Sequence, residues 1–168
     1  MSQLTTKLDV SGHEFRENVE FMENYVEKVR TVERNIRLSE EKYRERATKR
    51  GKLLPRERLS HLLDAGAPFV ELSSIAGYLM NGDTDGSTAG GNIIVGIGFV
   101  SGRRVLVMVW NYAIKGGTIS AATTRKKLRL QEIAFSTRLP IISLSESGGG
   151  NLAGGGDPDP WGVHGFLD

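Results

Sequence analysis

The stretch with the clearest capacity for chemistry is Ser-Gly-Gly-Gly-Asn at residues 147–151, which follows a short apolar run. The apolar run, residues 141–144, predicts a buried strand that ends at this loop. Consecutive glycines have no Cβ, so a ligand can come close to the backbone and the N–H groups can point at an oxygen that becomes negative. This is the construction of an oxyanion hole. A flexible glycine loop without chemistry has the same letters, so both interpretations remain open.

A second glycine pair lies at Lys115-Gly116-Gly117-Thr118, just before a predicted helix. A Gly-Gly turn at a helix start can bind anions through free N–H groups. The first half of that helix is basic, which fits either a phosphate contact or a solvated face. The basic residues are Arg125, Lys126, Lys127 and Arg129. The pattern Gly-x-x-x-x-Gly-Lys-[Ser/Thr] is missing, which excludes a nucleotide P-loop of that type.

The remaining polar residues favour structural roles. Glu146 could act as a base, but a carboxylate that accepts hydrogen bonds from nearby backbone N–H groups is the preferred interpretation. Asp83 and Asp85 look like the start of a calcium loop, yet the closing acidic residue is absent. No cluster has metal-ligand spacing, and we predict no metal site. The three histidines are expected to be structural or solvated: His13, His61 and His164.

Length and composition limit the class of protein. The chain has 168 residues, 39% of them hydrophobic and 25% charged, which indicates one globular domain or a piece of a larger one. A net charge of +2 is too mild to indicate nucleic-acid binding. The absence of cysteine excludes disulfides, thiol nucleophiles and Cys-based zinc sites. No run of 18 apolar residues predicts a membrane span, and we expect a cytoplasmic protein.

The first third of the chain predicts helices. Apolar residues at three- and four-residue steps predict a helix over residues 13–48, broken near Ser39 and begun by a capping box from Ser11 to Glu14. Its narrow apolar stripe predicts packing along another surface. The basic cluster at residues 42–52 is interpreted as a solvated face in preference to a phosphate site.

The rest of the chain predicts a mixed α/β fold. A short helix opens at Pro55, and Gly66 is placed to end it. A short strand over residues 68–72, a hairpin of residues 92–100 and 104–110, and a helix over 120–137 follow. The second hairpin strand is apolar on both faces, so we expect it to be central in a sheet. The glycine-rich tail, residues 151–168, has no periodicity and indicates an incomplete fold.

Four stretches together resemble the carboxyltransferase (β) subunit of biotin-dependent acyl-CoA carboxylases of the methylcrotonyl-, geranyl- and propionyl-CoA type. They are residues 50–72 with Arg-Gly-Lys-Leu-Leu-Pro-Arg-Glu-Arg-Leu, residues 96–103 with Gly-Ile-Gly-Phe-Val-Ser-Gly-Arg, residues 115–118, and residues 128–151. The resemblance implies an incomplete crotonase-like spiral of ββα units. Residues 1–66 would form an N-terminal helical arm, and residues 67–168 the first part of the carboxyltransferase N-domain.

The resemblance also implies a function and a site. A carboxyl group would move from carboxybiotin, held by a partner carrier protein, to the α- or γ-carbon of an acyl-CoA through an enolate. Gly148 and Gly149 would supply the catalytic amides. The expected substrate contacts are Lys115, Gly116, Gly117, Thr118, Lys126, Gly150 and Asn151. The implied partners are a biotin carboxylase and biotin carrier subunit, with the remaining carboxyltransferase half or further copies of the chain.

Departures from the family pattern keep other functions open. Family members are several hundred residues longer and usually have alanine where this chain has Gly150. The chain is therefore expected to be inactive alone. One alternative is a non-catalytic protein that binds acyl-CoA or another partner. The other is a component of a malonyl-CoA-type decarboxylase, which would use the same enolate site without biotin.

Overall fold

The structure, a computed structural model, describes residues 6, 8–80 and 83–149. The helices are α1 (His13–Ser39), α2 (Arg44–Lys49), α3 (Pro55–Leu62) and α4 (Ala121–Thr137), with 3-10 turns η1 (Glu40–Tyr43) and η2 (Lys115–Gly117). The strands are β1 (Val70–Glu71), β2 (Ile93–Val100), β3 (Arg103–Trp110) and β4 (Ile141–Leu144). The expected order of elements is confirmed, although the strand predicted over residues 68–72 is limited to β1.

The four strands form one sheet in the order β1-β2-β3-β4. β1 pairs with β2 and β2 with β3 in antiparallel fashion, whereas β3 and β4 are parallel. The tight hairpin of β2 and β3 followed by α4 is one ββα unit, and β4 follows after the crossover that a parallel pair requires. β3 lies between two strands and is buried along most of its length, which confirms its predicted central position.

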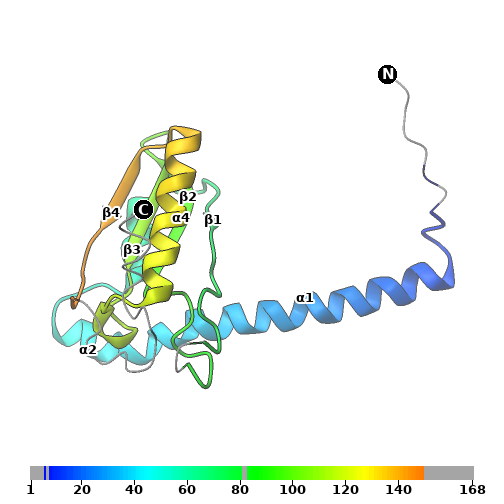
Figure 1. Cartoon of the computed structure of the whole chain (residues 1–168), viewed down its shortest axis with the longest axis horizontal. Coiled ribbons are helices and arrows are strands. Elements are labelled where there is room, and N and C mark those ends of the chain that lie inside the picture. Colours follow the sequence, from blue (N-terminus) through cyan, green and yellow to red (C-terminus); the bar gives the residue numbers. More distant parts are fainter. Residues whose placement is uncertain (1–5, 7, 81–82, 150–168) are drawn as a thin grey trace.

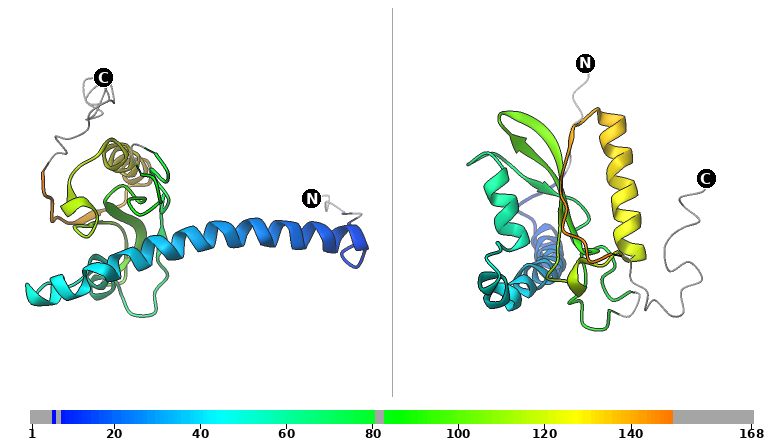
Figure 2. Two further views of the ribbon diagram at one scale, coloured as in Figure 1. Left: turned by 90° about the horizontal axis from the view of Figure 1, so that it is seen from below. Right: turned by 90° about the vertical axis from the view of Figure 1, so that its left-hand side faces the viewer.

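The side chains of β2 and β3 alternate between two apolar layers, because successive residues of a strand point to opposite faces. Leu106, Met108 and Trp110 pack with Leu130 and Ala134 of α4. Val105, Val107 and Val109 pack on the other face with Leu59 of α3. Figure 2 shows α4 and α3 on opposite sides of the sheet. The core is therefore a sheet between two helices. The chain leaves the C-terminal end of β3 and leads directly to the predicted site segment at residues 115–118.

The N-terminal helix α1 extends far beyond this body (Figure 1). The predicted break near Ser39 is confirmed, because α1 ends there and η1 leads into α2. The predicted capping box is wrong: Gly12 is the N-cap, it has no side chain to accept a hydrogen bond, and Ser11 is hydrogen-bonded to Asp9 instead. Ile36 is the buried residue of α1, so only the end of the helix joins the core.

β4 differs from its prediction as a buried strand. Among the described strands it pairs with β3 alone, and Ile141 is 43% exposed. The letters Ile-Ile-Ser-Leu predict burial, but burial also needs a neighbouring layer on both faces. Nothing in the described ranges is a helix long and apolar enough to span a bilayer.

Candidate functional site

The two glycine-rich segments singled out in the sequence lie side by side. We call residues 147–149, the described part of this loop, the glycine loop, and residues 115–118 the Lys-Gly-Gly-Thr turn. The Gly148 N–H donates to the Gly117 carbonyl at 3.2 Å, and the Ile119 N–H donates to the Gly149 carbonyl at 2.8 Å. The Ser147 hydroxyl also donates to the Gly117 carbonyl, at 3.3 Å. The turn after β3 and the loop after β4 thus form one backbone-lined unit at the same end of the sheet.

This contact explains why glycine is needed at two of the predicted site positions. A Cβ on Gly117 would lie 2.7 Å from the Glu146 carbonyl oxygen, and one on Gly148 would lie 2.6 Å from the Gly116 carbonyl oxygen. Both distances are shorter than atoms tolerate. Gly117 also has a φ of +72°, which side chains disfavour. The glycines are therefore required by the packing of two backbones, whatever chemistry follows.

The amides expected to act on an oxyanion already have acceptors. The Gly148 N–H uses the Gly117 carbonyl, and the Gly149 N–H donates to the Ser147 Oγ at 3.1 Å. Both bonds are longer than the common 2.9–3.0 Å of N–H···O bonds. An incoming oxygen atom would have to replace these acceptors.

A cleft of about 360 Å³ opens beside this unit. The glycine segments form one wall, with Gly116, Gly148 and Tyr112, and the other wall comes from η1, α2 and the residues that follow. The cleft is lined by Tyr43, Arg46, Ala47, Arg50, Lys52, Tyr112, Gly116, Glu146, Ser147 and Gly148. The basic cluster interpreted as a solvated face therefore contributes three side chains to the candidate site. Residues 43, 46, 47 and 50 have the spacing of one helical face. This spacing is the sequence signal that could have predicted that they line the same site.

Glu146 is paired with cations and not, as expected, with backbone N–H groups. Its carboxylate forms an ion pair with Lys52 and accepts a hydrogen bond from Arg58 Nη1 at 3.1 Å. These partners precede it by 94 and 88 residues, so no local pattern could have revealed them. The pair ties the start of the glycine loop to α3 and to the segment before it.

Lys126 does not lie on a solvated basic face. Its side chain is 6% exposed, and its Nζ donates to the carbonyl oxygens of Gly90 at 2.9 Å and Ile93 at 2.8 Å. Burial lowers the pKa of Lys126 to about 8, and the charge of Glu71 opposes that shift. The ammonium group fastens α4 to the start of β2. A direct contact of Lys126 with substrate, as the resemblance implies, does not fit this position.

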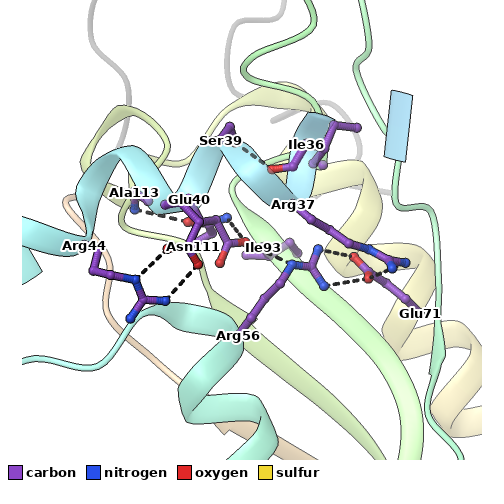
Figure 3. Close-up of polar contacts among 12 residues, drawn as sticks. Ile36, Arg37, Ser39, Glu40, Arg44, Arg56, Glu71, Ile93, Asn111 and Ala113 are labelled. Carbon is purple, nitrogen blue, oxygen red and sulfur yellow. Dashed lines mark hydrogen bonds and ion pairs between the residues drawn. The ribbon is translucent and has the colours of Figure 1, made fainter. Parts of the chain in front are cut away.

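A buried polar joint holds the loop after β3 (Figure 3). Asn111 Nδ2 donates to Glu40 Oε1 at 3.0 Å, and Asn111 Oδ1 accepts from the Ala113 N–H at 3.1 Å. Arg56 Nε lies 3.2 Å from Glu40 Oε1 without hydrogen-bond alignment, while the Arg56 fork binds Glu71 at 2.8 and 2.9 Å. The loop from Asn111 to the Lys-Gly-Gly-Thr turn is thus held by η1 and α3.

Burial controls the ionisation of this joint. The Glu40 side chain is 2% exposed, and burial raises its pKa to about 7 against the opposing charge of Arg56. Burial also disfavours the charge of Glu71, but the Arg56 hydrogen bonds and charge outweigh it and keep the Glu71 pKa below its ordinary value. The two terminal nitrogens of the Arg56 guanidinium therefore bind Glu71. Glu40, with its pKa raised to about 7, is the carboxyl group of this joint that changes charge near neutral pH.

The other predicted site residues have simpler outcomes. Thr118 Oγ1 donates to the Lys115 carbonyl, which closes the turn. Asp83 accepts hydrogen bonds from the N–H groups of Leu79 and Thr88, so it organises its own loop. Within the described ranges, no group of three or more His, Asp or Glu side chains could hold a metal ion. Three of the residues considered lie outside the described residues: Gly150, Asn151 and His164.

Residues 46–157 match the carboxyl transferase domain family. The chain belongs to this family. It is 40% identical over 162 residues to a probable mitochondrial methylcrotonoyl-CoA carboxylase beta chain of Drosophila melanogaster, covering 96% of this chain and 28% of that one. It is 47% identical over 112 residues to a 3-methylcrotonyl-coenzyme A carboxylase beta1 subunit of Mycobacterium tuberculosis, covering 67% of this chain and 21% of that one.

The solved structures agree with this family assignment. The beta subunit of geranyl-CoA carboxylase from P. aeruginosa superposes with a TM-score of 0.82 at 49% identity, over 89% of this chain and 28% of that chain. The crotonase-like α/β fold expected for this carboxyl transferase domain is confirmed. The chain spans about a quarter of the length of these relatives.

Proposed function

We propose that this carboxyl transferase chain supplies the acyl-CoA side of a carboxyltransferase. The enzyme would move a carboxyl group from carboxybiotin to the α- or γ-carbon of an acyl-CoA. The observation that carries the proposal is the backbone unit of the glycine loop and the Lys-Gly-Gly-Thr turn, which borders a cleft with an excess of basic side chains. The names of the relatives, methylcrotonoyl-CoA and geranyl-CoA carboxylase subunits, support this class of substrate.

In this mechanism the chain's own residues act through position and electrostatics. The thioester oxygen replaces the Gly117 carbonyl and the Ser147 Oγ as acceptors of the Gly148 and Gly149 N–H groups. Negative charge on that oxygen in the enolate makes these hydrogen bonds stronger, which lowers the barrier. Carboxybiotin on a partner carrier protein would provide the activated carboxyl group, and the biotin left after its loss would accept the proton that the acyl-CoA gives up. No described residue is assigned to hold carboxybiotin.

The partners and the division of the chain also remain proposals. We propose a biotin carboxylase and biotin carrier subunit as partners, together with the remaining carboxyltransferase half or further copies of the chain. Residues 1–66 would form the arm, and residues 67–168 the first part of the catalytic N-domain. Relatives include mitochondrial proteins, and a cytoplasmic location for this chain stays a prediction.

The thioester carbonyl itself provides the test. Methylcrotonyl-CoA or geranyl-CoA labelled with ¹³C at this carbon is mixed with the chain, and its NMR signal is recorded. Hydrogen bonds from the two amides polarise the carbonyl, so we expect a downfield shift on binding. Ser147→Ala removes the competing acceptor of the Gly149 N–H and should keep or increase the shift. Gly149→Ala, at a φ of +89°, should reduce it. Lys49→Ala, on the outer face of α2, is the matched control.

The internal hydrogen bonds of the two amides favour one competing function, which is acyl-CoA binding without catalysis. Binding with an unshifted carbonyl signal would support that function and reject the catalytic one. A chain that binds no acyl-CoA at all would reject both. Carboxylation of acyl-CoA by the chain together with a biotin carboxylase, its carrier and the remaining carboxyltransferase half would be the complementary positive result.

A further inference from the structure

The arm side of the cleft is built by α2 together with the residue before it, Tyr43 of η1, and the residue after it, Arg50. Tyr43, Arg46, Ala47 and Arg50 follow each other at steps of three, one and three residues, and all four line the cleft. In a helix this spacing puts side chains in one row. The row faces Gly116 and Gly148 of the backbone unit across the cleft. Two guanidinium groups one helical turn apart therefore stand opposite the predicted acyl-CoA contacts.

Ion pairing sorts the basic residues of this segment into two sets. On the outer face, Arg44 pairs with Glu41 and Glu57, and Lys49 pairs with Glu45. On the cleft face, Arg46 and Arg50 form no ion pair with any residue in the described part of the chain. Lys42 likewise forms no ion pair within the described residues, but it lies outside the cleft, so Arg46 and Arg50 are the unpaired cations of this segment that line it. This separation is what the sequence could not show.

The other charges of the cleft largely cancel. Lys52 and Glu146 form an ion pair at its edge, and Arg58 also donates to Glu146. Among the lining residues this leaves the positive charges of Arg46 and Arg50 without compensation. A cleft of about 360 Å³ with two free guanidinium groups is suited to a compact dianion.

We propose that Arg46 and Arg50 bind a phosphate group of the coenzyme A part of the substrate. The inference rests on the proposed function, because it is the acyl-CoA that brings the phosphates to this cleft. A guanidinium fork matches two phosphate oxygens at once, and two forks satisfy a dianion better than one lysine could. Tyr43, in the same row, presents an aromatic ring beside the phosphate position. The helical arm thereby becomes part of the substrate site.

The test measures the affinity of the whole chain for unacylated coenzyme A by titration calorimetry. Arg46→Ala and Arg50→Ala should each weaken binding about tenfold or more, as expected for a lost charge-assisted hydrogen-bond pair. Arg50→Lys keeps the charge but not the fork and should be intermediate. Lys49→Ala lies on the outer face of the same helix and should change the affinity less than about twofold, because exposed pairs contribute little. Circular dichroism checks that helix content is unchanged.

A second ligand, 3′-dephospho-coenzyme A, identifies the phosphate. If the arginine variants lose affinity for coenzyme A only, the 3′-phosphate is bound; if they lose affinity for both ligands, the diphosphate is bound. Either result supports the proposal. Affinities of the two arginine variants equal to that of Lys49→Ala would overturn it while leaving the proposed function intact. A wild-type chain that binds neither ligand would overturn both.

Discussion

Glu146 anchors the glycine loop through ion pairs, although no catalytic role is assigned to its side chain. It lies two residues before Gly148, and its carboxylate is held by Lys52 and Arg58. Its own carbonyl oxygen would lie 2.7 Å from a Cβ on Gly117. The residue thus connects the glycine loop, the Lys-Gly-Gly-Thr turn and the segment around α3.

Replacing Glu146 with glutamine should loosen this connection. The variant keeps the shape but loses the charge that two cations share, so we expect the free energy of unfolding to fall by about 2 kcal/mol. Urea denaturation followed by circular dichroism measures it. Glu132→Gln is the control, because its ion pair with Arg129 on α4 is exposed. Equal effects of the two substitutions would show that the Glu146 pairs do not anchor the loop.

Lys126 was predicted to contact substrate, but its buried ammonium group forms hydrogen bonds inside the protein. Lys126→Met leaves the carbonyl groups of Gly90 and Ile93 without their shared donor. We expect a loss of about 3 kcal/mol in the free energy of unfolding, the upper range for hydrogen bonds to a charged group. Arg125→Met, one residue earlier and exposed, should change it by less than about 0.5 kcal/mol. A stable Lys126→Met chain that binds acyl-CoA poorly would restore the substrate role.

At the scale of elements, the joint between α1 and α2 decides where the site loop lies. The backbone tightens into η1, which carries Glu40 into the protein against Asn111 at the end of β3. Arg56 comes from α3 and Glu71 from β1, so four separate elements meet at this point. Lys126 of α4 and Arg37 of α1 add charge around Glu71. A change of charge at Glu40 therefore alters electrostatic interactions with the arm, the sheet and the loop at the same time.

This joint predicts a pH dependence of stability. The pKa of Glu40 is raised from 4.5 to about 7 in the fold, so the folded chain holds a proton that the unfolded chain has lost. The stability contribution is present below pH 4.5 and is lost as the pH rises through about 7, on the order of 3 kcal/mol in total. Glu40→Gln should abolish this decline. Urea denaturation of both chains between pH 4.5 and 8 measures it, and an unchanged decline in Glu40→Gln would assign it to another group.

At the scale of the whole molecule, nothing within residues 8–80 and 83–149 forms a layer against the outer part of α1. Val19, Met22, Val26 and Val29 follow each other at steps of three, four and three residues, and the buried Ile36 lies seven residues after Val29. Met22 is 57% exposed. This spacing of 3.5 residues is the period of a helix–helix seam. A second exposed apolar area lies at the edge strand β4, where Ile141 is 43% exposed.

We therefore expect the chain to self-associate through the exposed stripe of α1. Sedimentation velocity should show species larger than the monomer at micromolar concentration. Met22→Lys with Val26→Lys puts charges in the seam and should shift the chain toward monomer. Asn24→Lys adds a charge away from the stripe and should not. A cooperative, monodisperse wild-type monomer would contradict the expectation.

The sequence by itself determined the local features of this protein. Periodicity and turn residues placed the helices, the hairpin and the break near Ser39, because these follow from interactions between near neighbours. The glycine patterns at residues 115–118 and 147–151 marked the two site segments. The resemblance of four stretches taken together, residues 50–72, 96–103, 115–118 and 128–151, named the carboxyltransferase family correctly.

Only the tertiary structure decided which side chains face the site. Lys126 and Arg46 look alike in the sequence, yet one is buried beneath β2 and the other lines the cleft. Glu146 pairs with Lys52 and Arg58, which lie about half the chain length away in sequence, and the apolar side chain of Ile141 is nearly half exposed. Burial and ion pairing depend on partners far away in sequence, and these partners come together only when the sheet and its helices pack.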